Sequence, residues 1–199
     1  MFLDQDYWGK PVPGFGDLGA RIAIVGLAPA AHGANRTGRI FTGDRSGDFL
    51  FAALHRAALA SQPTSTARDD GLTLQGVFIV ATLRCAPPAN RPQPDEVARC
   101  APLLDRELAL LPDIRVVLAL GAIAWDAYLA HATRLGRGPA SPRPRFAHGS
   151  SWIPPGSGPI LLGSYHVSQQ NTQTGRLTPA MFDGVLQEAK WAATVNDTP

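Results

Sequence analysis

The sequence is poor in the residues that define several protein classes. It contains two cysteines, too few for a disulfide framework or for a metal site that takes four thiolates from these residues. Of its cations only Lys10 and Lys190 are lysines, and neither lies in a glycine-rich loop that holds nucleoside triphosphates. No apolar run approaches the roughly 18 residues of a membrane span. The acidic start, residues 1–6, lacks the layout of a signal peptide. These absences favour a soluble, cytoplasmic protein.

The composition that remains is that of one ordinary domain. The chain has 199 residues, 45% of them apolar and 17% charged, and its net charge of +2 argues against intrinsic disorder. We expect a single domain over residues 1–199, with residues 1–20 as an extended lead-in. Of the 18 cations, 16 are arginine, which binds phosphate and planar anions well. Genomic base composition produces the same arginine bias, so this feature alone identifies no ligand.

Four short apolar runs alternate with stretches of helical periodicity. The runs cover residues 21–27, 76–83, 115–120 and 159–165, and the helical stretches cover residues 46–59, 94–111, 122–132 and 178–193. The runs are almost continuously apolar, which is typical of parallel strands covered on both faces. We therefore predict a three-layer α/β/α fold with a central four-stranded parallel sheet. Residues 61–70 and 134–158 are rich in Gly, Pro, Ser and Arg and are expected to form surface loops.

The loops that follow the strands are the places to look for a site. In an open parallel sheet, ligands bind beyond the carboxyl ends of the strands. The loops over residues 26–45, 84–91 and 166–177 hold one acid, Asp44, and six arginines: 36, 39, 45, 84, 91 and 176. One interpretation is a cationic rim for a polyanion with one carboxylate inside it. The other is that the acids simply fall on the helices.

Several familiar mechanisms are excluded, and Asp44 itself has two interpretations. No Gly-x-Ser-x-Gly elbow follows a strand, and the five histidines lack zinc-ligand spacing. Asp44 precedes a predicted helix, so it can serve as a helix cap as well as a catalytic carboxylate.

Two long motifs give the sequence a specific resemblance. They are Gly-Leu-Ala-Pro-Ala-Ala-His-Gly-Ala-Asn-Arg-Thr-Gly-Arg-Ile-Phe-Thr-Gly-Asp at 26–44, the first motif, and His-Val-Ser-Gln-Gln-Asn-Thr-Gln-Thr-Gly-Arg-Leu-Thr at 166–178, the second motif. With Cys-Ala-Pro-Pro-Ala-Asn at 85–90 and Tyr-Trp-Gly-Lys-Pro-Val-Pro-Gly-Phe-Gly at 7–16, they closely resemble the uracil-DNA glycosylase superfamily. Family five, the type B enzymes, is the nearest. The resemblance extends from Tyr7 to Trp191 and implies hydrolysis of a base–sugar bond in DNA.

The resemblance implies roles for four side chains. Asp44 would stabilise an oxocarbenium-like sugar or orient water, and His166 would donate to the departing base, for which a neutral ring suffices. Phe41 would stack on a flipped base. Asn90 would hydrogen-bond the base or place water near Asp44. Each has a plain structural alternative: Phe41 as a core residue, His166 as a strand-end hydrogen-bonder, and Asn90 as a turn residue.

The resemblance also implies which residues surround the base and hold the DNA. Backbone amides of Gly26, Leu27, Ala28 and Pro29 would line the pocket, where glycine permits close approach. The stretch from Ser168 to Arg176 would enter the minor groove as the nucleotide swings out. The expected DNA-binding residues are Arg36, Arg39, Ser168, Gln169, Asn171, Thr174 and Arg176.

Two departures from stricter relatives predict loose specificity. Ala81 stands where strict uracil enzymes carry an asparagine, so that no side-chain amide there reads the pyrimidine edge. Ala30 and Ala31 stand where stricter relatives place a polar catalytic residue, which leaves more of the chemistry to Asp44. Type B relatives accept other deaminated bases such as hypoxanthine, and the same breadth is implied here.

The resemblance further implies a four-iron, four-sulfur cluster, of which this sequence contains half the ligands. Cys85 and Cys100 match the second cysteine pair of the family, whereas the first pair, upstream of the Tyr-Trp motif, is absent. A cluster needs four thiolates. The natural start lies upstream of Met1, or the chain was trimmed, or this lineage lost the cluster. We expect the first of these, while two ordinary reduced cysteines remain the alternative.

Three functions remain to be compared. The leading hypothesis is a monomeric, monofunctional DNA glycosylase, since no lysine near the pocket could form a Schiff base. The second is a DNA-binding module of the same fold with weak or no catalysis. The third is a small-molecule nucleosidase, which the arginine-rich loops and the groove-entering stretch argue against.

Overall fold

The computed structural model describes residues 6–195, so that most of the acidic start discussed above lies outside the described part. Within it, a six-stranded sheet has the order β1-β3-β2-β4-β6-β5. Its four central strands are parallel and lie within the predicted apolar runs: β2 (Ile22–Gly26), β3 (Val77–Ala81), β4 (Val116–Leu120) and β6 (Ile160–Ser164). The predicted α/β fold is therefore confirmed.

The sheet has two strands more than the four predicted. Two further strands, β1 (Phe15–Gly16) and β5 (Ser151–Trp152), pair antiparallel with β3 and β6 at the two edges. Each has only two residues, too few to show a periodic pattern in the sequence. The residue-1–20 lead-in therefore contains a strand, and so does the loop predicted over residues 134–158.

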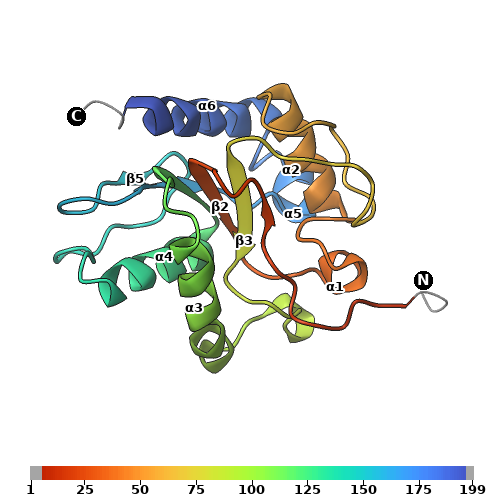
Figure 1. Cartoon of the computed structure of the whole chain (residues 1–199), viewed down its shortest axis with the longest axis horizontal. Helices are drawn as coiled ribbons and strands as arrows, with labels where there is room; N and C mark the ends of the chain where they lie inside the picture. The colour runs from red at the N-terminus through yellow and green to blue at the C-terminus, as the bar shows by residue number, and fades with distance from the viewer. Residues whose placement is uncertain (1–5, 196–199) are drawn as a thin grey trace.

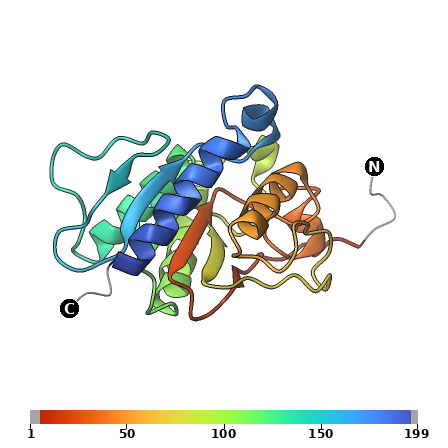
Figure 2. The same cartoon turned by 90° about the horizontal axis from the view of Figure 1, so that it is seen from above.

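Helices cover both faces of the sheet. Helices α2 (Arg45–Arg56) and α6 (Pro179–Val195) pack on one face, and α3 (Pro94–Ala109) and α4 (Ala122–Arg134) pack on the other (Figures 1 and 2). Alternate residues of each strand point into the two cores. In β2, for example, Ile24 joins the α2–α6 core and Val25 joins the α3–α4 core. Burial on both faces explains why the strands read as continuous apolar runs.

The strand order defines where a ligand site is expected. The chain passes from β2 outward to β3 on one side, and then to β4 on the other side of β2. In open α/β sheets ligands bind at such a reversal of direction, which here lies beyond the carboxyl ends of β2 and β4. Three short helical turns lie in the loops after the strands: α1 (Ala34–Thr37), η1 (Pro88–Asn90) and α5 (Gln169–Gln173).

The lead-in packs against the first motif. The backbone N–H of Trp8 donates to the carbonyl of Arg36 at 3.1 Å, and the Tyr7 hydroxyl lies 2.7 Å from His32 Nδ1. A side chain at Gly38 would overlap the Trp8 indole, so the two segments fit closely. In the described part, no helix is long and apolar enough to cross a membrane.

Candidate active site

Phe41 is held in an unusual backbone conformation at the centre of the first motif. Its φ of 53° lies in the left-handed region, which costs a non-glycine residue free energy and is found most often at functional sites. Two glycines accommodate it. A Cβ at Gly26 would lie 2.9 Å from two atoms of the Phe41 ring, and a Cβ at Gly47 would overlap the Phe41 carbonyl. The ring is only 6% exposed, so it is also part of the α2–α6 core.

Asp44 is both a helix cap and a half-buried carboxylate. It is the N-cap of α2, and its Oδ1 accepts a hydrogen bond from the Gly47 N–H at 3.0 Å. Its other oxygen lies against Gly33, where any side chain would overlap it. Burial raises the pKa of Asp44, against the lowering effect of the Gly47 and Ser46 amides. The cap interpretation is thus confirmed.

His166 faces the same place from the second motif. Its ring centroid lies 6.3 Å from that of Phe41, with the two planes inclined at 36°. The Cβ of His166 lies beside Gly121, directly after β4. Burial lowers the pKa of His166 to about 4, so the imidazole is neutral at physiological pH. A neutral ring can still donate one N–H.

The Gly26–Pro29 segment follows β2 and is paired with the residues that follow β3. The carbonyls of Gly26 and Leu27 accept from the N–H groups of Thr82 and Leu83, each at 2.9 Å. This pairing fixes the backbone that follows β2 to the backbone that follows β3. Ala81 lies opposite Gly26 in the sheet and is 1% exposed. Ala28 is partly exposed and Pro29 is buried.

Arg39 is not placed for the predicted contact with DNA. Its side chain is 3% exposed and forms an ion pair with Asp70 at 2.7 Å. It also donates to Thr42 Oγ1 at 3.0 Å and to Ser65 Oγ at 2.8 Å. Burial would raise the pKa of Asp70, but Arg39 and three backbone amides outweigh it and lower this pKa to about 2. Arg39 therefore anchors the Phe41 loop from behind, a structural role that the cationic-rim hypothesis did not anticipate.

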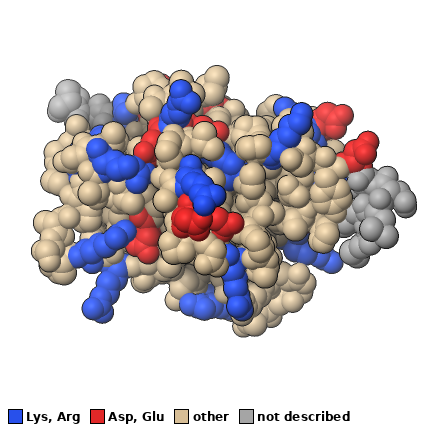
Figure 3. All heavy atoms as spheres, turned by 90° about the horizontal axis from the view of Figure 1, so that it is seen from below, with Lys and Arg blue, Asp and Glu red and all other residues tan. Residues whose placement is uncertain are grey.

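Arg84 is likewise absent from the rim. It is buried and pairs with Glu107 of α3, Nη2 to Oε2, at 2.7 Å. Arg45, Arg91 and Arg176 are exposed, and Arg36 is partly so. On the face shown in Figure 3, cationic side chains are spread among acidic ones and form no single patch. Of the six arginines predicted to form a cationic rim, the four that are at least partly exposed remain candidates.

The second motif forms one short helix rather than an open loop. Ser168 caps α5, accepting from the Asn171 N–H at 3.4 Å, and the Asn171 side chain donates to the His166 carbonyl at 2.8 Å. Asn171 thus holds the backbone of His166, and Ser168 in turn holds Asn171. Gln169, Thr174 and Arg176 are exposed. The predicted DNA contacts of this stretch remain predictions.

Asn90 lies on the exposed turn η1, with a positive φ of 55°. Its N–H donates to the Pro87 carbonyl at 3.1 Å, as the turn interpretation requires. Within the described residues its side chain has no hydrogen-bond partner. Its predicted role beside Asp44 stays a prediction.

Cys85 and Cys100 are both free thiols. Cys85 is exposed in the loop after β3, and Cys100 is partly exposed on α3. Burial, and to a lesser extent the Cys100 thiol, raise the pKa of Cys85. Among the described residues, no group of three or more Cys, His, Asp or Glu side chains is arranged to hold a metal ion.

Sequence reasoning missed a stack of side chains behind His166. Tyr165 lies 5.1 Å from His148 in a parallel arrangement, and the Arg176 guanidinium lies 4.7 Å from the Tyr165 ring. The Tyr165 N–H donates to His148 Nδ1 at 3.2 Å. His148 comes from the loop before β5, and no motif marked it. The stack joins that loop to both ends of the second motif.

The site combines a planar aromatic face, a neutral imidazole and a partly desolvated carboxylate at one edge of a parallel sheet, which is suited to removing a base from a sugar. The sequence pattern of the uracil DNA glycosylase superfamily matches residues 13–190. The chain belongs to this superfamily.

Three relatives are similar to the chain over most of its length. The chain is similar to the type-5 uracil-DNA glycosylase of Mycobacterium tuberculosis, at 53% identity over 98% of this chain and 71% of the relative. It is 56% identical to the type-5 uracil-DNA glycosylase of Thermus thermophilus over 95% of this chain and 83% of the relative. With that of Pyrobaculum aerophilum, identity is 47% over 92% and 76% of the two chains.

Proposed function

We infer that this chain is a type-5 uracil-DNA glycosylase. It excises uracil from DNA by hydrolysing the N-glycosidic bond, leaves an abasic site and so begins base excision repair. Besides the identity to its relatives, one observation carries this function: the Phe41 ring lies 6.3 Å from the His166 ring, beside the loop that ends in Asp44. The two motifs thus meet at one site. This meeting favours a working enzyme over a DNA-binding module without catalysis.

The geometry supports a division of labour in the reaction. The flipped base stacks on Phe41, and His166 donates a hydrogen bond to the base carbonyl as negative charge gathers there. Because burial keeps the pKa of His166 at about 4, the ring acts as a neutral donor and transfers no proton. Asp44 stabilises the developing positive charge on the sugar or orients the attacking water. Its Gly47 hydrogen bond fixes the carboxylate during this step.

A broad choice of base is part of the proposal. The methyl group of Ala81 has no hydrogen-bonding capacity, so this position reads neither edge of a pyrimidine. Asn90 supplies a mobile polar contact to the base or to water. Hypoxanthine and other deaminated bases are therefore expected substrates beside uracil.

The iron–sulfur cluster is a separate proposal about Cys85 and Cys100. These 199 residues supply two thiolates where a four-iron cluster takes four, so the described residues do not by themselves fit the cluster. No catalytic step is assigned to it. We propose that the pair binds a cluster only where two further thiolates are supplied from outside these residues. Iron analysis of Cys85→Ser and Cys100→Ser in a longer form tests this directly.

DNA is the proposed partner, and it is bound by one monomer in the prokaryotic cytoplasm. Arg36, Gln169, Thr174 and Arg176 are the side chains expected at the phosphates or in the minor groove. Arg176 is exposed and lies over Tyr165, which immediately precedes the second motif. A phosphate bound at Arg176 would therefore lie beside this motif.

The test is release of uracil from a labelled duplex under single-turnover conditions. We expect excision from the duplex, none from a thymine control, and little from free deoxyuridine. Binding of duplex without release of any deaminated base would establish the DNA-binding module instead. Equal turnover of free deoxyuridine and duplex would establish a nucleosidase.

A further inference from the structure

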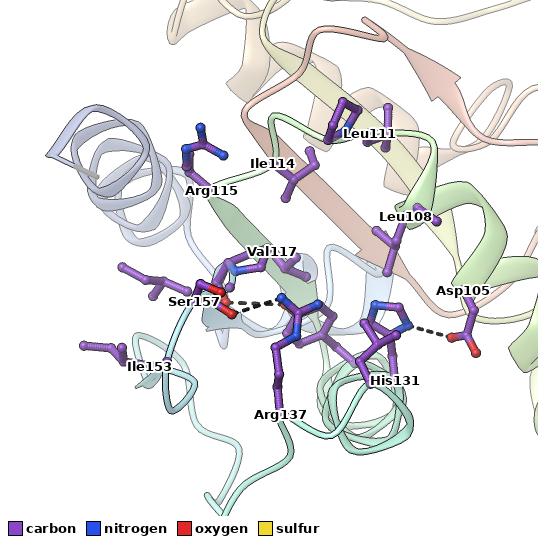
Figure 4. Close-up of a pocket in the computed structure, with 18 residues that line it drawn as sticks. Asp105, Leu108, Leu111, Ile114, Arg115, Val117, His131, Arg137, Ile153 and Ser157 are labelled. Atoms are coloured by element: carbon purple, nitrogen blue, oxygen red, sulfur yellow. Dashed lines mark hydrogen bonds and ion pairs between the residues drawn. The ribbon is translucent and has the colours of Figure 1, made fainter. Parts of the chain in front are cut away.

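A second concave site lies at the edge of the sheet opposite the candidate active site. A cavity of about 680 Å³ is bounded by Arg115 and Ile160, at the beginnings of β4 and β6, by α4, and by the loop before β6 (Figure 4). Phe41 and His166 stand beyond the other ends of these parallel strands. A five-residue strand rises about 13 Å, so the two sites are separate. The volume is within the range of about 300–1,000 Å³ that small-ligand sites occupy.

The cavity has an apolar floor and an apolar rim. Leu111, Ile114 and Val117 are buried at its base. At its mouth Leu135 and Ile153 are 50% and 71% exposed. Large apolar side chains around a concave opening are favourable contacts for a ligand with an apolar or aromatic body.

The charged groups of the cavity leave an excess of positive charge. Asp105 is the one acid in the lining, and Arg134 meets its carboxylate twice, at 2.7 and 2.6 Å. Arg115 and Arg137 also line the cavity, and neither has a carboxylate partner in the described part of the chain. Arg137 donates to the Ser157 carbonyl at 3.0 Å (Figure 4). Figure 4 draws the two guanidinium groups at different places around the cavity, so each is available to an acceptor of its own, and guanidinium groups favour phosphate.

His131 adds a hydrogen-bond acceptor. Its Nδ1 lies 2.6 Å from Asp105 Oδ1, and a carboxylate can only accept, so Nδ1 carries the proton. Burial lowers the pKa of His131 more than Asp105 raises it, which leaves Nε2 with a free lone pair. The neighbouring Tyr128 ring, 5.6 Å away, provides an aromatic wall. A ligand with an N–H or O–H group at this depth would satisfy Nε2.

We propose that this cavity is a binding site for a nucleoside monophosphate. The phosphate would lie at Arg115, the base would lie among the apolar side chains and Tyr128, Arg137 would donate to an oxygen of the sugar or base, and an N–H or O–H would donate to His131. A fatty carboxylate fits less well, because His131, Arg137 and Ser157 interrupt the apolar lining. The nucleotide is a free molecule or the phosphorylated end of a strand, which present the same chemistry. The proposal is independent of the glycosylase function.

Calorimetric titration with dAMP, dUMP and inorganic phosphate tests the proposal on the whole chain. Binding of a monophosphate is expected, with each of Arg115→Ala and Arg137→Ala weakening it at least about tenfold, as loss of a charge-assisted hydrogen bond does. Ile153→Asp should weaken it too, and this exposed position puts the fold at little risk. Arg143→Ala is the matched control, because Arg143 pairs with Asp126 outside the cavity and should bind like the parent. Uracil excision should be unchanged in all four variants.

Three results would overturn the proposal. The first is an absence of binding to any monophosphate at millimolar concentration. The second is binding that Arg115→Ala, Arg137→Ala and Ile153→Asp leave intact while Phe41→Ala abolishes it, since the ligand is then in the active site. The third is decanoate or inorganic phosphate binding as tightly as the nucleotides. Competition by a 5′-phosphorylated trinucleotide distinguishes a strand end from a free nucleotide, and binding at Arg115 and Arg137 supports the proposal in either form.

Discussion

The rings of Phe41 and His166 lie 6.3 Å apart at an inclination of 36°, although they come from motifs near opposite ends of the chain. This separation is within the contact range of aromatic pairs. The proposed stacking surface and the proposed hydrogen-bond donor are therefore neighbours, and Asp44 ends the first motif, which also contains Phe41.

Asp44 caps α2 and has a proposed chemical role, and substitutions at this position can test the two roles separately. Asp44→Asn keeps an oxygen for the Gly47 N–H, whereas Asp44→Ala removes the cap and should cost about 0.5–2 kcal/mol of stability. The raised pKa of Asp44 means that its charged form is disfavoured by folding above the unfolded pKa. At pH 7, urea unfolding should find Asp44→Asn at least as stable as the parent and Asp44→Ala less stable. A destabilised Asp44→Asn would contradict this account of the burial.

His166 should remain neutral throughout the working range. Its pKa of about 4 in the folded chain is below the value of about 6.5 in an unfolded one. The folded state therefore binds this proton less tightly, and His166 lowers stability as the pH falls from about 6.5 towards 4. Histidine resonances of the parent, assigned with His166→Asn, should show a midpoint near 4. A midpoint near 6.5 would refute the neutral-donor role.

Phe41 should matter more for base recognition than its burial suggests. Base–aromatic stacking contributes about 1–3 kcal/mol per base, so Phe41→Ala should reduce excision about tenfold to hundredfold under subsaturating conditions. Phe41→Tyr retains the aromatic face and serves as the control. Equal losses in Phe41→Tyr and Phe41→Ala, in folded proteins, would argue for a purely structural ring.

Substitutions of Arg39 and Arg176 should have different effects, because Arg39 anchors the Phe41 loop and Arg176 is expected to bind DNA. Arg39→Gln leaves Asp70 buried without its cation, a change that costs about 3–5 kcal/mol in buried pairs. Arg176→Gln loses the contact with the Tyr165 ring and should cost no more than about 1 kcal/mol of stability, but it should weaken DNA binding, with the salt-dependence slope reduced by about 1. Thermal unfolding and salt titrations of both variants check this. A normal melting temperature for Arg39→Gln would show that the Phe41 loop is anchored elsewhere.

The sequence predicted the parallel core well because burial on both faces leaves a strong local signal. The central strands lie within their predicted runs, and α6 begins at Pro179, one residue after the predicted start at residue 178. The edge strands β1 and β5 were not predicted, because two residues are too few to show the alternation of apolar and polar residues that marks a strand. The resemblance brought Phe41, Asp44 and His166 to attention, while their proximity came only from the fold.

Arginine was the residue type that sequence reasoning interpreted least well. Nothing local distinguishes Arg39, which is buried on Asp70, from Arg176, which is exposed on Tyr165. Arg39 is buried because it pairs with Asp70, and Asp70 lies in a different loop. The contact of Asn171 could not be predicted from the local sequence either, because its hydrogen bond to the His166 carbonyl forms only within the α5 turn.

The central claim is that Asp44 supplies the charge that makes base removal fast. The most direct measurement is the single-turnover rate of uracil release from a saturated duplex by Asp44→Asn, beside the parent at pH 7. Because the substitution keeps the helix cap, we predict a folded protein whose rate falls at least about a hundredfold, the loss typical of one electrostatic group in an active site. A folded Asp44→Asn that releases uracil at the parent rate would contradict the account.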